Sequence, residues 1–150
     1  MKKKLFLGIL LCLVCCLMMG CAQTTGKKAE TESDAVDIDL TTLGGTMVYA
    51  TVENMMNKPD EYMGKSVRAE GIYYAEYCEE TDMYYHFVVI VDATACCQQG
   101  LEFLRNGEYV YPDDYPENEA MIEVVGVYGQ YEELGETYYY LAVDELTVLG

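Results

Sequence analysis

The chain has 150 residues, enough for one domain of ordinary size. Its 26 acidic and nine basic residues give a formal net charge of −17, which argues against the basic surface that nucleic-acid binding requires, so we expect no nucleic-acid partner. A hydrophobic content of 51%, with 15 tyrosines and no tryptophan, excludes a wholly disordered chain and fits a small acidic globular domain.

The N-terminus has the pattern of a targeting segment. Three lysines, Lys2 to Lys4, precede an apolar run of fifteen residues, from Leu5 to Met19. A membrane-spanning helix needs about 20 apolar residues. The shorter run therefore predicts the core of a signal peptide over residues 1–20.

A cysteine follows this run directly, in the sequence Leu17-Met18-Met19-Gly20-Cys21. The segment resembles the lipobox of bacterial lipoproteins, although Met18 and Met19 depart from its usual residues. The resemblance implies that Cys21 is acylated on its sulfur and becomes the first residue of the mature protein. The partner would then be the cell membrane, with the protein anchored on its extracytoplasmic face. A cleaved secretory signal and an uncleaved short anchor, with Cys21 incidental, remain alternatives.

Residues 21–45 are rich in Thr, Ser, Asp and Glu and contain no aromatic residue. This composition predicts a disordered tether. Residues 46–150 are then the folded domain. Thr46 is a candidate N-cap for a helix whose apolar face carries Val48, Val52, Met55 and Met56, and Pro59 should end that helix.

The rest of the chain alternates in the manner of β-strands. We predict five strands, separated by turns and by one Pro-rich acidic loop at 111–119. They are Ser66–Tyr77, Tyr84–Asp92, Leu101–Leu104, Met121–Tyr131 with a bend or bulge at its glycines, and Thr137–Leu149. The fold class is therefore mainly β, a small five-stranded barrel with one N-terminal helix.

One motif adds to this prediction. It combines Pro59, Tyr62, Gly64, Lys65, Val67 and Gly71. The pattern, a helix followed by this motif and by long hairpins, resembles the OB-fold domains of small bacterial lipoproteins. The resemblance implies an OB-like barrel over roughly residues 47–149. Such barrels often bind oligonucleotides or oligosaccharides.

Adjacent cysteines, Cys96 and Cys97, follow the second predicted strand. Thiolates are soft ligands for zinc and copper. The segment is similar, in its two cysteines only, to an extracytoplasmic family associated with metal-regulated permeases. A disulfide between neighbours would be strained and easily reduced. The alternative to a metal or redox role is that one Cys packs in the core and the other is partly exposed.

Larger catalytic or metal sites are disfavoured by spacing. A zinc site with Cys78, Cys96, Cys97 and His86 would have to bridge about 20 Å, because Asp92 lies six residues further along the strand than His86. The same distance disfavours a catalytic arrangement that uses His86, the only histidine, so we expect no enzymatic activity. The acidic loop carries oxygen ligands, but its spacing is not that of an EF-hand and indicates a solvated loop.

Tyrosines are the remaining candidates for binding. Ten lie along or beside the predicted strands: Tyr73, Tyr74, Tyr77, Tyr84, Tyr85, Tyr128, Tyr131, Tyr138, Tyr139 and Tyr140. Roughly half should face the core. We take Tyr73, Tyr128 and Tyr139 as representatives of a ligand face. Its uncharged polar groups suit a glycan or an envelope protein better than a phosphate chain. The sequence thus predicts a non-enzymatic binding protein, or alternatively a thiol-based zinc, copper or redox module at Cys96 and Cys97.

Overall fold

A computed structural model describes residues 35–91 and 98–150 of the chain. Residues 35–150 belong to one compact unit. The predicted signal peptide, Cys21, and the cysteine pair Cys96 and Cys97 lie outside the described residues.

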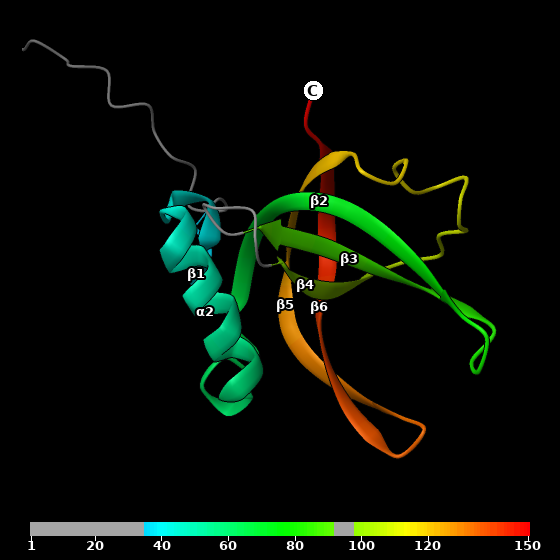
Figure 1. Cartoon of the computed structure of the whole chain (residues 1–150), viewed down its shortest axis with the longest axis horizontal. Coiled ribbons are helices and arrows are strands. Elements are labelled where there is room, and N and C mark those ends of the chain that lie inside the picture. The colour runs from blue at the N-terminus through cyan, green and yellow to red at the C-terminus, as the bar shows by residue number, and fades with distance from the viewer. Residues whose placement is uncertain (1–34, 92–97) are drawn as a thin grey trace, which may run out of the picture. The chain divides into compact units, whose positions relative to one another are not determined.

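The described chain is mainly β (Figure 1). The elements in order are β1 (Ile38–Asp39), η2 (Leu40–Thr42), α2 (Gly45–Asn57), η3 (Pro59–Glu61), β2 (Ser66–Cys78), β3 (Met83–Val91), β4 (Gln98–Arg105), β5 (Met121–Glu133) and β6 (Glu136–Val148). All five predicted strands are present, and α2 is the one α-helix in the described ranges.

Five strands close into a barrel. In the order β2, β3, β4, β6, β5, each strand pairs with the next, and β5 pairs in turn with β2. The β4–β6 pairing is parallel, whereas the other barrel pairings are antiparallel. The prediction of a five-stranded OB-like barrel preceded by one helix is thereby confirmed.

Strand β2 pairs with two different strands of the barrel along its length. Its first half, Ser66 to Ile72, pairs with β5, and its second half, Ile72 to Cys78, pairs with β3. Gly71 lies at the change of partner, where a Cβ atom would meet the Val89 carbonyl oxygen at 2.5 Å. Beyond the barrel wall, the β2–β3 and β5–β6 hairpins project as two arms that diverge from each other (Figure 1). These arms form the walls of the candidate site.

The predicted irregularity in β5 is also present. The register between β5 and β6 shifts between Val125 and Gly126. A Cβ atom at Gly126 would meet the Ala142 carbonyl oxygen at 2.6 Å. Glycine therefore lets the two strands approach closely at the bulge.

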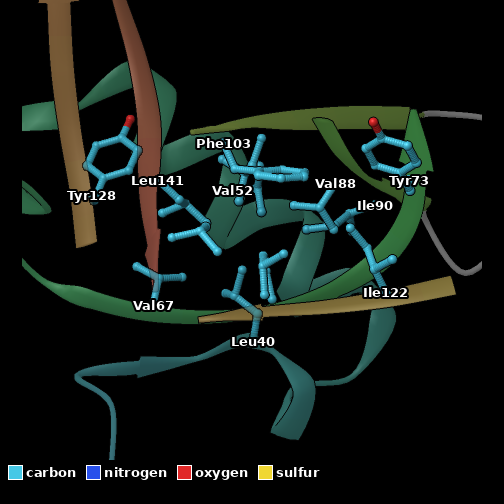
Figure 2. Packing of buried hydrophobic residues seen from close by; sticks show 14 of the residues in the cluster. Leu40, Val52, Val67, Tyr73, Val88, Ile90, Phe103, Ile122, Tyr128 and Leu141 are labelled. Carbon is cyan, nitrogen blue, oxygen red and sulfur yellow. The ribbon is translucent and has the colours of Figure 1, made fainter. Parts of the chain in front are cut away.

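The barrel interior is filled by alternate residues of the strands and by one side of α2 (Figure 2). Val52 and Met55 of the helix are fully buried, whereas Met56, predicted on the same face, is 45% exposed. Tyr73 and Tyr128 lie at opposite ends of the labelled cluster in Figure 2. Val48 is partly buried against the core, so three of the four residues predicted for this face of the helix pack there and Met56 does not.

Buried tyrosine hydroxyls need polar partners, and Tyr128 finds one in the helix. Its hydroxyl donates to the Met55 carbonyl oxygen at 2.9 Å. The last four carbonyls of a helix have no partner within it. The Asn54 carbonyl accepts from the Lys58 N–H instead, and that of Met55 from Tyr128. This hydrogen bond ties the C-terminal end of α2 to β5.

Two predictions about the start of the domain are wrong. The helix begins at Gly45 with Gly44 as its cap, so Thr46 is not the N-cap. The predicted tether also extends too far, because Ile38–Asp39 pairs in parallel with Val67 and Arg68 of β2, and Leu40 is only 2% exposed in the core. Asp37 reinforces this pairing by accepting from the Ser66 N–H and hydroxyl, both at 2.8 Å.

The Tyr128 hydrogen bond can be tested by removing one oxygen. Tyr128→Phe leaves the Met55 carbonyl without this donor, so we expect the free energy of unfolding to fall by about 1–2 kcal/mol in urea denaturation. Tyr74→Phe, at a half-exposed position on β2, is the matched control and should change it little. Equal effects of the two substitutions would contradict this account of the helix attachment.

Candidate functional site

The tyrosines divide between the two faces of the barrel wall. Tyr73 and Tyr128 are 0% and 1% exposed, and Tyr139 packs partly buried against the core, its ring stacked on Tyr128 at 6.0 Å. These three residues therefore face inward and do not form the ligand face for which we chose them. Because side chains alternate along a strand, their neighbours of opposite parity project outward.

Three outward tyrosines, Tyr85, Tyr131 and Tyr138, line a cleft of about 640 Å³ between the two hairpin arms, which we call the hairpin cleft. Tyr77, which has the same parity on β2 as Tyr73 but is 47% exposed, also lines it. Its lining includes four tyrosines and five glutamates: Tyr77, Tyr85, Tyr131 and Tyr138, with Glu76, Glu79, Glu80, Glu102 and Glu133. No Lys, Arg or His lines it in the described part of the chain. The volume is in the range of small-molecule sites. The cleft therefore suits an uncharged or cationic ligand and repels anions.

Glu102 lies in the lining of this cleft and is buried. Leu101 and Phe103, its neighbours on β4, are core residues, so Glu102 projects to the outer face between Phe87 of β3 and Tyr140 of β6. It is nevertheless only 7% exposed. A carboxylate on the outer face of the barrel is thus removed from water by the residues around it.

The partner of Glu102 is a neutral hydroxyl. The Tyr131 hydroxyl oxygen lies 2.9 Å from Oε1 and 3.1 Å from Oε2 of Glu102, and the hydroxyl donates its single proton to this carboxylate. The pKa of Glu102 is raised, mainly by burial and further by repulsion from Glu133. The hydrogen bond from Tyr131 acts in the opposite direction and lowers this pKa. Burial and the neighbouring carboxylate likewise raise the pKa of Tyr131. The pair forms a negative centre in the lining of the cleft.

A second tyrosine–glutamate pair connects the two arms. The Tyr85 hydroxyl of β3 donates to Glu133 Oε2 of β5 at 2.6 Å and lies 2.9 Å from the Thr81 hydroxyl. On β5 and β6, the rings of Tyr131 and Tyr138 stack with centroids 5.5 Å apart. These contacts hold the tyrosine side chains of the cleft in place in the absence of a ligand.

Cys78 also lines the cleft, as a free and partly buried thiol. Hydrogen bonds from the side chain and backbone of Thr81, and from the backbone of Glu80, lower its pKa. It pairs with Met83, one residue away from the predicted Tyr84 pairing, and therefore projects to the face opposite His86. The predicted same-face arrangement of Cys78 and His86 is wrong, which removes that pair from a shared metal site.

His86 lies inside the barrel, 5% exposed. Its Nδ1 is 2.8 Å from the Tyr73 hydroxyl, and the Tyr115 ring stacks on the imidazole with centroids 3.9 Å apart. Burial lowers the pKa of His86 to about 4. His86 is therefore a core residue with a neutral imidazole, and Tyr115 packs against that ring.

Tyr115 belongs to the predicted acidic loop, which closes this end of the barrel. The Arg105 guanidinium lies 3.5 Å from the Tyr109 ring centroid and donates to the Asp114 carbonyl oxygen at 2.7 Å. Asp114 itself accepts from the Val110 N–H at 2.8 Å. Among the described residues, no group of three or more His, Cys, Asp or Glu is arranged to hold a metal ion.

The three tyrosines taken from the sequence as the ligand face have the parity that faces the core, whereas tyrosines of the other parity line the cleft. Tyr85, Tyr131 and Tyr138 were among the ten candidates, whereas Glu102 was missed. Glu102 stands between the apolar residues Leu101 and Phe103, as a solvent-facing residue of an ordinary strand would. The sequence therefore carries no signal of its burial. The thiol site at Cys96 and Cys97 stays a prediction.

Comparison with protein-family models finds no matching family, and comparison with curated proteins finds no match. Within residues 35–91 and 98–150, no helix has the length and apolar character needed to cross a membrane.

The burial of His86 predicts loss of stability in acid. An unfolded histidine titrates near its ordinary pKa of 6.5, and the folded one at about 4, so the unfolded chain binds more protons between these values. The contribution is present above pH 6.5 and is lost as the pH falls toward 4, by about 3 kcal/mol at most. Urea unfolding at several pH values measures it.

The control for this experiment is His86→Gln, which keeps an acceptor near Tyr73 and does not titrate. The carboxylates titrate in both proteins, so the difference between the two pH profiles isolates the histidine. Parallel profiles would show that His86 is not buried in its neutral form.

Proposed function

We propose that this protein is a lipid-anchored extracytoplasmic binding protein, without enzymatic activity, whose hairpin cleft binds a saccharide. The observation that carries the proposal is the cleft itself, about 640 Å³ with tyrosine rings, carboxylates and no basic residue in its lining. It lies between the two hairpin arms and over β3 and β4, which is where OB barrels bind oligosaccharides and oligonucleotides.

The chemistry of the lining favours a saccharide over a nucleic acid. Phosphates would meet five glutamates, including the buried Glu102, and no compensating cation among the described lining residues. Sugar hydroxyls, in contrast, can donate to carboxylates and to the Thr81 hydroxyl. The flat rings of Tyr131 and Tyr138 offer apolar faces to the C–H surface of a sugar ring.

The lipid anchor is supported by the sequence pattern that ends at Cys21. Mass spectrometry of the protein from its native membrane should find a chain that begins at an acylated Cys21. Cys21→Ala should leave the chain unacylated, because it removes the sulfur that would carry the acyl group. An unacylated native chain that still begins at Met1 would contradict the proposal.

Saccharide binding is tested by isothermal titration calorimetry of the purified protein with three trisaccharides: cellotriose, the N-acetylglucosamine trimer and the glucosamine trimer. At least one should bind, and Tyr131→Ala should weaken that binding at least tenfold, because the aromatic wall is lost. Tyr138→Ala is a second variant in the same wall.

Two controls make the result specific. Tyr74→Ala removes a half-exposed tyrosine that does not line the cleft, and Cys96→Ser/Cys97→Ser removes the adjacent thiols. Both should bind as the unaltered protein does. Failure of all three trisaccharides, or equal binding by Tyr131→Ala and Tyr74→Ala, would overturn the proposal.

A further inference from the structure

The hairpin cleft holds more negative charge than its own residues compensate. Glu102 is more than nine-tenths buried, and the partner of its carboxylate is the neutral Tyr131 hydroxyl. Arg68, which pairs with Asp39 and Glu123, does not line the cleft. A buried carboxylate without a cationic neighbour is costly, and a ligand that brings the cation relieves that cost.

A second carboxylate, on the β5–β6 arm, lines the same cleft. Glu133 of β5 and Glu102 both line the hairpin cleft, and repulsion from Glu133 contributes to raising the pKa of Glu102. Glu133 is likewise held by a tyrosine, through the 2.6 Å hydrogen bond from Tyr85. The two hydroxyls orient both carboxylates but add no positive charge.

Aromatic rings stand beside these carboxylates. The Tyr131 ring stacks on Tyr138 at 5.5 Å and meets Tyr140 edge-on at 5.6 Å. Tyrosine faces attract ammonium groups, and the attraction is stronger where water is excluded. Carboxylates with tyrosine faces around them form a site for an organic cation, whereas an inorganic divalent cation would find few oxygens converging, since no metal-binding group is present among the described residues.

From this geometry we infer that the ligand of the hairpin cleft is an amino sugar with a free ammonium group, which binds between Glu102 and Glu133 while its ring packs on Tyr131. The inference rests on the proposed function and narrows it from saccharides in general to cationic ones. The cleft volume accommodates the sugar as well as the ammonium, which distinguishes this ligand from a bare amine.

The test compares ligands that share one backbone and differ in charge. The glucosamine trimer and the N-acetylglucosamine trimer are titrated into the purified protein by calorimetry at about pH 6, where sugar amines carry charge and ordinary glutamates are ionised. The glucosamine trimer should bind at least tenfold more tightly. Spermidine, which has ammonium groups without a sugar ring, should bind more weakly than the glucosamine trimer.

Variants then locate the charge that is responsible. Glu102→Gln keeps the shape of the side chain and an acceptor for Tyr131 but removes the charge, so it should lower affinity for the glucosamine trimer at least tenfold and leave the N-acetylated trimer unaffected. Glu133→Gln, at the half-buried arm position, should act in the same direction and covers the case in which Glu102→Gln fails to fold. Glu145→Gln, an exposed residue that does not line the cleft, is the control and should bind normally.

The outcomes separate the inference from the function on which it rests. Equal affinity for the two trimers, or tight binding that survives both glutamate substitutions, would overturn the amino-sugar inference and leave a saccharide-binding cleft. Spermidine binding as tight as that of the glucosamine trimer would also overturn it, because the ring would then contribute nothing. Absence of binding by every trisaccharide would overturn both.

Discussion

Closure of the barrel by β2 and β5 is the constraint on which the remaining structure depends. The two strands pair over Ser66 to Ile72 and Met121 to Val127 and leave their other halves free to run on with β3 and β6. Two glycines permit close approaches between these strands and their other neighbours, Gly71 against the Val89 carbonyl of β3 and Gly126 against the Ala142 carbonyl of β6. The extensions become the arms, and the arms create the cleft. A site of this shape therefore follows from the length of the strands rather than from a separate binding element.

The two faces of the barrel wall divide the tyrosines into two roles. The inward ones make polar contacts inside the core, as Tyr73 does with His86 and Tyr128 with the helix carbonyl of Met55. The outward ones orient carboxylates, as Tyr131 does for Glu102 and Tyr85 for Glu133. A tyrosine-rich composition without tryptophan thus serves both the packing and the site, because one side chain offers an apolar ring and a hydroxyl.

Much of this architecture could be predicted from the sequence. The strand-like segments predicted all five strands, and Pro59 predicted the end of the helix. The pairing of β1 with β2 could not be predicted, because a strand of two residues, Ile38 and Asp39, is too short to show a periodic pattern. The choice of Tyr73, Tyr128 and Tyr139 failed because alternation separates two faces without saying which one the fold encloses. Glu102 could not be recognised, since its burial arises from arms that come from β2–β3 and β5–β6, distant in sequence.

The central claim is that Glu102 is a buried carboxylate whose cationic partner is supplied by the ligand. The pKa of its carboxyl group tests this claim directly. Site-resolved NMR titration of the Glu102 side-chain carboxyl in the purified protein measures its pKa with and without the glucosamine trimer. The account predicts a pKa above that of the exposed glutamates in the free protein, and a lower one when the ammonium is bound, because a nearby positive charge favours the ionised form. An ordinary pKa in the free protein that the trimer does not change would contradict it.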